Sequence, residues 1–153
     1  MMQKLLAERF QLVFHRERKA ISVYALRVAE GGPKLTKSKG NVSVAHHWFH
    51  GTTGELNPVG ASMADFADVL QQYIVDRPVF DQTGITGTYD FALNWKPDNS
   101  QFPLAHIKML PAGSTNLPPL STAIQQQLGL RLDTVTAPTE VMVIDHVEKP
   151  SFN

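Results

Sequence analysis

Cysteine is absent from the 153 residues of this chain. Its absence excludes disulfide bonds, metal sites built on thiolates and catalysis by a cysteine nucleophile. The compartment stays open, because a chain without cysteine suits a reducing or an oxidising environment equally well. We expect no cofactor; the alternative is a divalent metal such as zinc or calcium, held by histidine or oxygen ligands.

The chain also has no formal net charge, because Lys and Arg total 14 residues and Asp and Glu also total 14. A balanced chain has no summed field that would attract a phosphate backbone or an anionic membrane surface. We therefore expect no nucleic-acid partner. The partner that we expect is an unknown protein or a small molecule.

Long apolar runs are absent too, since no segment approaches the roughly 18 apolar residues of a membrane span. Lys4, Glu8 and Arg9 lie where a signal peptide needs an unbroken apolar stretch. The chain as written is thus expected to have no membrane span and no export signal. Its abrupt start inside a helical pattern leads us to expect a truncated part of a longer protein.

The residues that are present have the composition of a globular protein. Hydrophobic residues make up 42% of the chain and charged residues 18%, which is typical of a folded rather than a disordered sequence. A length of 153 residues is ordinary for one domain. We predict a single α+β domain over residues 1–153.

One pattern, a helix followed by two strands, occurs three times along the chain. The second copy begins with a capping-box pattern at Ser62 to Asp65, and the third has Ser121 as its expected N-cap and Gly129 as its C-cap. The predicted helices cover residues 2–10, 62–74 and 121–128. The predicted strands cover residues 11–15, 21–28, 79–80, 88–95, 130–132 and 141–147, with a polar turn at 16–19 and a bend at Ala137–Pro138.

An internal repeat of this kind constrains the fold more than any single element does. We predict an α+β fold of three helix–strand–strand repeats, with one mainly antiparallel sheet and the helices packed on one face. At least one of Gly84 and Gly87 should have a positive φ, because the chain reverses direction there. The side chains expected to be at least partly buried are Leu12, Phe14, Val23, Phe91, Leu93, Leu132, Val143 and Ile144.

Two segments connect the repeats. Residues 41–49 alternate in the manner of a strand. Residues 97–119 hold five of the ten prolines without a clear period, which predicts a long Pro-rich surface loop. Loops of that length often carry binding sites.

Several strings are similar to a known family. They include residues 5–10 (LLAERF), 31–35 (GGPKL), 77–79 (RPV), 83–91 (TGITGTYDF) and 143–150 (VIDHVEKP). The chain resembles the C-terminal portion of a soil-associated family of uncharacterised bacterial proteins, a domain of unknown function with many paralogues per genome. The resemblance implies a periplasmic or secreted location, because family members usually carry an export signal and a preceding segment. It implies no catalytic residues.

The densest group of metal-ligand side chains is His46, His47 and His50, with Glu55 or a distant Asp as a completing ligand. In a strand, His46 and His50 share a face about 13 Å apart and His47 points to the other face. One metal ion would need a bend to reach all three. The alternative is that these are surface or edge-strand histidines.

Other patterns allow weaker interpretations. Residues 60–64 (GASMA) approach the nucleophile elbow of serine hydrolases, but no buried strand precedes Ser62, which favours an N-cap. His15 with Glu17, and Asp145–His146 with Glu148, are acid–base pairs or solvated groups. Asp81, Asp90, Asp98 and Asn99 lack the spacing of a calcium loop. Trp48 and Trp95 are candidates for binding a partner or a sugar, and burial in the core is their alternative.

Two functional hypotheses follow. The first is a non-enzymatic extracytoplasmic interaction or ligand-binding domain, because no catalytic set is complete. The second is a small metal-dependent hydrolase acting on an ester, lactone or amide, with His46, His47 and His50 as ligands and a carboxylate as general base.

Overall fold

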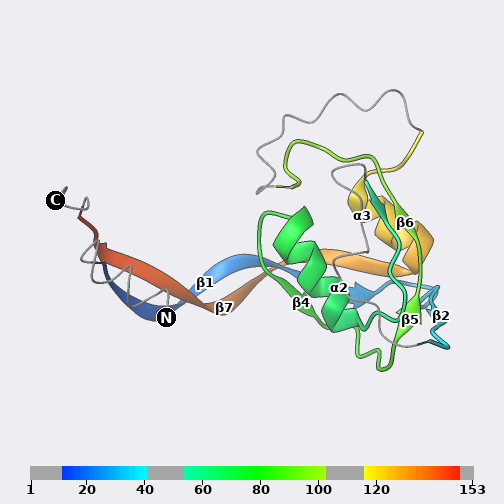
Figure 1. Ribbon diagram of the computed structural model, residues 1–153, viewed down its shortest axis with the longest axis horizontal. Helices are drawn as coiled ribbons and strands as arrows, with labels where there is room; N and C mark the ends of the chain where they lie inside the picture. The colour runs from blue at the N-terminus through cyan, green and yellow to red at the C-terminus, as the bar shows by residue number, and fades with distance from the viewer. Residues whose placement is uncertain (1–11, 41–53, 103–115, 149–153) are drawn as a thin grey trace. The chain divides into compact units, whose positions relative to one another are not determined.

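The computed structural model describes residues 12–40, 54–102 and 116–148. These residues group into two units: unit 1 contains the described residues up to Ser22 and from Thr136 onward, and unit 2 contains those from Val23 to Val135. Two long strands, β1 (Val13–Val28) and β7 (Leu130–His146), contribute to both units (Figure 1).

Unit 1 is built from the first part of β1 and the second part of β7, which are neighbours in one sheet. His15 contacts Asp145, and the next residue, Arg16, contacts Glu140, which comes earlier in the chain than Asp145. The two strands therefore run in opposite directions, as in an antiparallel pair. Large apolar side chains are nevertheless exposed in this unit. They are Val13, Met142, Ile144 and Val147.

The continuity of the two strands corrects two predicted interruptions. The predicted turn at residues 16–19 is wrong, because these polar residues lie within β1, where Arg16 forms an exposed ion pair with Glu140 of β7. The predicted bend at Ala137–Pro138 is wrong too. Proline is tolerated inside β7 because this strand lies at the edge of the sheet order β4-β1-β7.

Unit 2 contains two helices that each begin as an α-helix and end as a π-helical turn. The first is α2 (Met63–Val69) with η2 (Leu70–Ile74), and the second is α3 (Leu120–Ala123) with η3 (Ile124–Leu128). Ser62 caps α2 through the predicted capping box with Asp65, which confirms the N-cap interpretation. The N-cap of α3 is Pro119 instead of the predicted Ser121.

Gly129 ends the second helix as predicted. Its φ of 64° lies in the left-handed region that favours glycine, and its N–H donates to the carbonyl oxygens of Gln125 and Ile124. Gly84 and Gly87 also have positive φ values, 68° and 93°, which confirms the turn predicted there.

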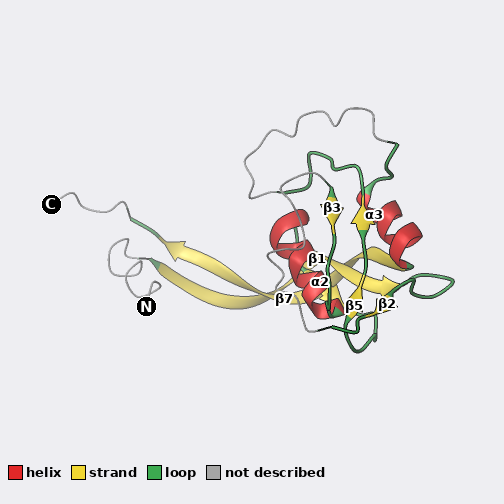
Figure 2. Ribbon diagram, turned by 45° about the vertical axis from the view of Figure 1, so that its right-hand side comes forward, coloured by secondary structure: helices red, strands yellow, loops and turns green. Residues whose placement is uncertain are grey.

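The described strands form three small sheets instead of the single predicted sheet (Figure 2). Strand β4 (Val79–Asp81) pairs with β1 in parallel. Strand β2 (Thr36–Lys37) pairs with β5 (Tyr89–Asp90), and β3 (Glu55–Leu56) pairs with β6 (Leu93–Asn94), both antiparallel. The fold is therefore α+β with mainly antiparallel pairing, as predicted.

The threefold repeat is not visible in the described residues. The first predicted helix, residues 2–10, and the predicted strand at 41–49 lie outside them. The predicted strand 88–95 divides into β5 and β6, which pair with different partners, so the second copy does not end in one strand.

The hydrophobic core lies in unit 2, where α2 packs against β4 and α3 packs against β6. Phe66 and Phe91 meet edge to face with ring centroids 5.1 Å apart. Of the side chains expected to be at least partly buried, Val23 and Leu93 are fully buried. The prediction is wrong for Ile144, whose side chain is 59% exposed. The expectation is confirmed for the partly buried side chains of Leu12, Phe14, Phe91, Leu132 and Val143.

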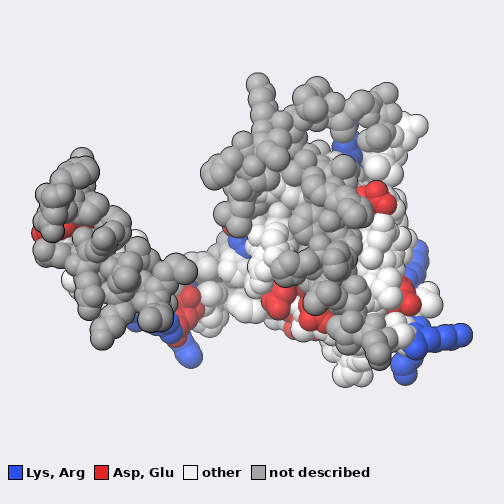
Figure 3. All heavy atoms as spheres, viewed as in Figure 1, with Lys and Arg blue, Asp and Glu red and all other residues white. Residues whose placement is uncertain are grey.

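The described surface of unit 2 carries charges of both signs. Figure 3 shows Lys and Arg side chains gathered over the end that bears β2, while acidic side chains lie over the middle of the same face. None of the helices in the described residues is long and apolar enough to cross a membrane.

Candidate functional site: a pocket in unit 2

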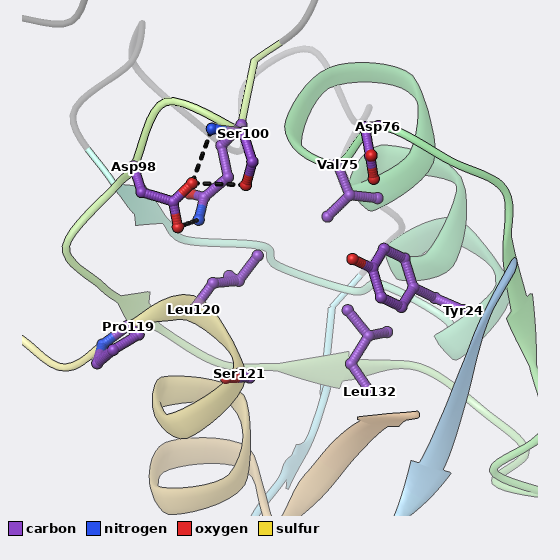
Figure 4. A pocket seen from close by; sticks show the side chains of 10 residues that line it. Tyr24, Val75, Asp76, Asp98, Ser100, Pro119, Leu120, Ser121 and Leu132 are labelled. Carbon is purple, nitrogen blue, oxygen red and sulfur yellow. Dashed lines mark hydrogen bonds between the residues drawn. The ribbon is translucent and has the colours of Figure 1, made fainter. Parts of the chain in front are cut away.

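A pocket of about 160 Å³ opens in unit 2 (Figure 4). This volume is close to that of an engineered apolar cavity of about 150 Å³ that binds benzene. Side chains from both long strands, the end of one helix, the start of the other and a loop surround it. They are Tyr24, Val75, Asp76, Asp98, Ser100, Gln101, Pro119, Leu120, Ser121 and Leu132.

The local structure explains how distant segments meet at the pocket. The helix ending in η2 places Val75 and Asp76 at one wall, and the start of α3 places Pro119 to Ser121 at another. Phe102 N–H donates to the Ile74 carbonyl at 2.8 Å, which fastens the loop to the end of η2. Lys96 N–H donates to the Pro118 carbonyl at 2.8 Å, which joins the two ends of the predicted Pro-rich loop.

The loop wall is held by a chain of hydrogen bonds that starts at Asp98. One oxygen of this carboxylate accepts from Ser100 N–H at 2.8 Å and from the Ser100 hydroxyl at 2.5 Å. The other oxygen accepts from Gln101 Nε2 at 3.0 Å, and Gln101 Oε1 accepts from Trp95 Nε1 at 2.6 Å. Gln101 is only 9% exposed, so these bonds fix a buried amide beside the pocket.

The opposite wall contains a charged pair. Both oxygens of Asp76 accept from Arg77 at 2.9 Å. These bonds lower the pKa of the Asp76 carboxyl and raise that of the Arg77 guanidinium. The guanidinium also lies over the Tyr24 ring, 5.0 Å from its centroid, so one face of the ring is occupied.

The interior of the pocket combines apolar walls with hydroxyl groups. Figure 4 shows Val75, Leu120 and Leu132 around the opening, with the Tyr24 ring directed into it. The hydroxyls of Tyr24 and Ser121 have no hydrogen-bond partner among the described residues. The pocket can therefore hold a small apolar group against these walls and form hydrogen bonds with it.

The described lining residues contain no histidine, lysine or arginine. Ser121 and Ser100 therefore have no imidazole or amine base beside them in the described lining, and Asp98 is engaged by three donors.

The predicted metal ligands and one predicted binding aromatic lie outside the described residues. They are His46, His47 and His50, and Trp48. The described residues contain no group of three or more His, Cys, Asp or Glu side chains that could hold a metal ion.

Trp95, the second predicted binding aromatic, lies in the core and is 1% exposed. Its ring stacks on Phe102 with centroids 6.3 Å apart, and its indole N–H supports the pocket wall through Gln101. The ring thus presents no exposed face to a partner, and it positions a residue that lines the pocket.

The predicted acid–base pairs are rearranged in unit 1. His15 contacts Asp145 at 2.8 Å instead of Glu17, and His146 contacts Glu148 at 3.1 Å. The hydrogen bond to Asp145 is the main reason that the pKa of His15 is raised. All four side chains are exposed, so these are surface pairs.

Sequence reasoning missed most of the pocket. The sequence patterns indicate only a weak role for Asp98, as a calcium ligand. They indicate no binding site at Tyr24, Asp76 or Leu132. The Asp98-Asn99-Ser100 string is typical of a turn in which a carboxylate accepts from the backbone two residues on, and this signal predicts the Asp98 loop.

The described residues thus define an α+β protein in which residues 98–101, after β6, form one wall of a small pocket. A family model described as "Protein of unknown function (DUF3738)" matches residues 1–147, nearly the whole chain. The chain belongs to this family. Neither a curated protein nor a solved structure matches it.

Proposed function

We propose that this chain is a non-enzymatic ligand-binding domain that takes a small molecule, or one side chain of a protein partner, into the pocket of unit 2. The observation that carries the proposal is the construction of the loop wall. Asp98, Gln101 and Trp95 are connected by hydrogen bonds, so the wall needs little reordering when a ligand enters.

The shape of the pocket supports binding of a compact group. A volume near 160 Å³ suits a ligand of about the size of benzene, which is smaller than a nucleotide or a sugar chain. Leu120 and Leu132 offer apolar contact, and the Tyr24 hydroxyl offers a hydrogen bond that selects orientation.

Two-dimensional ¹H–¹⁵N NMR tests the proposal with a set of benzene-sized compounds at millimolar concentration. The indole N–H signal of Trp95 is a suitable reporter, because its acceptor Gln101 lines the pocket. We expect at least one compound to shift this signal together with the amide signals of Ser100 and Leu132.

Two variants on the same helix provide the matched control. Ser121→Phe fills the pocket, and Gln125→Phe adds the same ring at an exposed position that does not line the pocket. Binding should be lost in Ser121→Phe and kept in Gln125→Phe. Equal binding by both variants, or shifts confined to residues away from the pocket, would contradict the proposal.

The location and origin of the protein are also proposed, from the resemblance of its sequence strings. We propose that this is the C-terminal portion of a soil-associated bacterial protein with many paralogues, and that it acts in the periplasm or outside the cell. Fractionation of cells that produce the full-length protein would test the location, and recovery in the cytosol would contradict it.

A further inference from the structure

We propose that the ligand of this pocket is a small organic amine in its protonated form, with an apolar body and a single positive charge. This inference rests on the proposed function and specifies its ligand. The inference is argued from the charges at the pocket walls and from the apolar surface between them.

The charges at the two walls do not cancel. Asp76 is neutralised by Arg77, whose guanidinium bonds both carboxylate oxygens and stacks on Tyr24. Asp98 accepts only from neutral donors, and it has no ion pair among the described residues. The described pocket walls with Arg77 thus retain one negative charge.

Asp98 is exposed, but it lies at a pocket wall, where the protein displaces part of the screening solvent on one side, so it attracts a cation more strongly than a carboxylate in open water does. The described lining residues include no cationic side chain that would compete for Asp98. A bound anion would find no compensating charge in the same lining.

The remaining groups define the rest of the ligand. Val75, Leu120 and Leu132 favour an apolar body, while the Tyr24 and Ser121 hydroxyls can accept hydrogen bonds from an ammonium group. Figure 4 shows Asp98 on one side of the opening and Tyr24 on the other, so the charge and the Tyr24 hydroxyl lie at opposite walls of the pocket.

Three compounds of matched shape test the class: benzylamine, benzyl alcohol and benzoate, each titrated into the full chain and followed by the Trp95 indole signal. We expect benzylamine to bind about tenfold or more tightly than benzyl alcohol, and benzoate to bind most weakly. The preference for the amine should shrink as salt is added.

Two substitutions in similar turns supply the matched pair. Asp98→Asn removes the charge and keeps a side-chain oxygen for Ser100, so the preference for benzylamine should fall to near unity. Asp81 makes the same kind of turn with Thr83, outside the pocket, at 2.9 Å to its N–H and 2.8 Å to its hydroxyl. Asp81→Asn should therefore keep the preference.

The outcomes separate this inference from the proposed function. Equal binding of benzylamine and benzyl alcohol by the unaltered chain, or tighter binding of benzoate, overturns the amine assignment and leaves a pocket that binds ligands. A preference for benzylamine that persists in Asp98→Asn also overturns the inference. If none of the three compounds nor any other compound of this size binds, both proposals fail. The comparison in the unaltered chain decides the ligand class even if Asp98→Asn does not fold.

Discussion

Replacing Gly129 by alanine should destabilise the fold strongly, for two reasons that add. Gly129 has a φ of 64°, and an alanine in this left-handed region costs about 1–2 kcal/mol relative to glycine. A Cβ atom at this position would also collide with the backbone carbonyl oxygen of Gly32 and would lie 3.0 Å from the Lys34 nitrogen. A backbone collision cannot be relieved by rotating a side chain.

The backbone around Gly32 has little freedom to move away. Lys34 N–H donates to the Leu128 carbonyl at 2.8 Å, and Ala29 N–H donates to the Gly129 carbonyl at 3.0 Å. Overpacking of this kind costs about 1–3 kcal/mol. The two terms together predict a loss of roughly 2–5 kcal/mol in the free energy of unfolding, a large part of the 5–15 kcal/mol typical of a domain.

Gly84→Ala is the matched control, because Gly84 has nearly the same φ, 68°, and nothing within 4 Å of the position of a Cβ atom. It should lose only the conformational part, about 1–2 kcal/mol. Urea unfolding followed by far-ultraviolet circular dichroism measures both variants. Equal losses in the two variants would refute the assignment of a steric role to the contact between Gly129 and Gly32.

Three further predictions concern the caps, the pocket wall and unit 1. Ser62→Ala should lower the free energy of unfolding by about 1 kcal/mol in the same urea experiment, because the capping box of α2 is removed; no loss would contradict the capping role. Trp95→Phe should cost about 1–3 kcal/mol in that assay, since the buried Oε1 of Gln101 loses its donor, and a neutral result would mean that water or another group replaces it. The pKa of His15, followed by NMR, should lie above its ordinary value and return toward it in Asp145→Asn. Because the folded-state pKa is raised, the pair stabilises the fold at pH below the ordinary pKa of histidine, and this contribution disappears as the pH rises through the raised value; an unchanged pKa in Asp145→Asn would exclude the pair as its cause.

Local chemistry made part of the fold predictable. The capping box at Ser62 and the left-handed glycine at position 129 each depend on contacts between residues close in sequence, so their signals are complete within a short string. The buried positions of β1 and β6 followed from alternation of apolar residues. The predicted turn at 16–19 failed because a polar run also suits a solvent-exposed strand, and only the pairing with β7 distinguishes the two.

The pocket could not be predicted in the same way, because its lining comes from five separate segments. Tyr24 and Leu132 are more than a hundred positions apart, and no local pattern connects them. Trp95 shows that residue type alone does not predict a binding role, because an aromatic side chain suits an exposed binding face and a core equally well. Its hydrogen bond to Gln101 gives it an indirect role at the site that the sequence does not reveal.

The π-helical turn at the end of η2 is a further reason why the pocket could not be predicted from the sequence. Val75 N–H donates to the Leu70 carbonyl at 2.8 Å, five residues back, so this turn holds one residue more than an α-helical turn would. The helix ends directly after this turn, because Val75 has an extended backbone, and Val75 and Asp76 then lie at the pocket wall. The apolar spacing of residues 62–74 matches an ordinary amphipathic helix and contains no sign of the extra residue. The place of Val75 and Asp76 at the pocket wall therefore depends on where η2 ends, and Leu70 and Ile74 hold η2 in place by their burial in the core of unit 2.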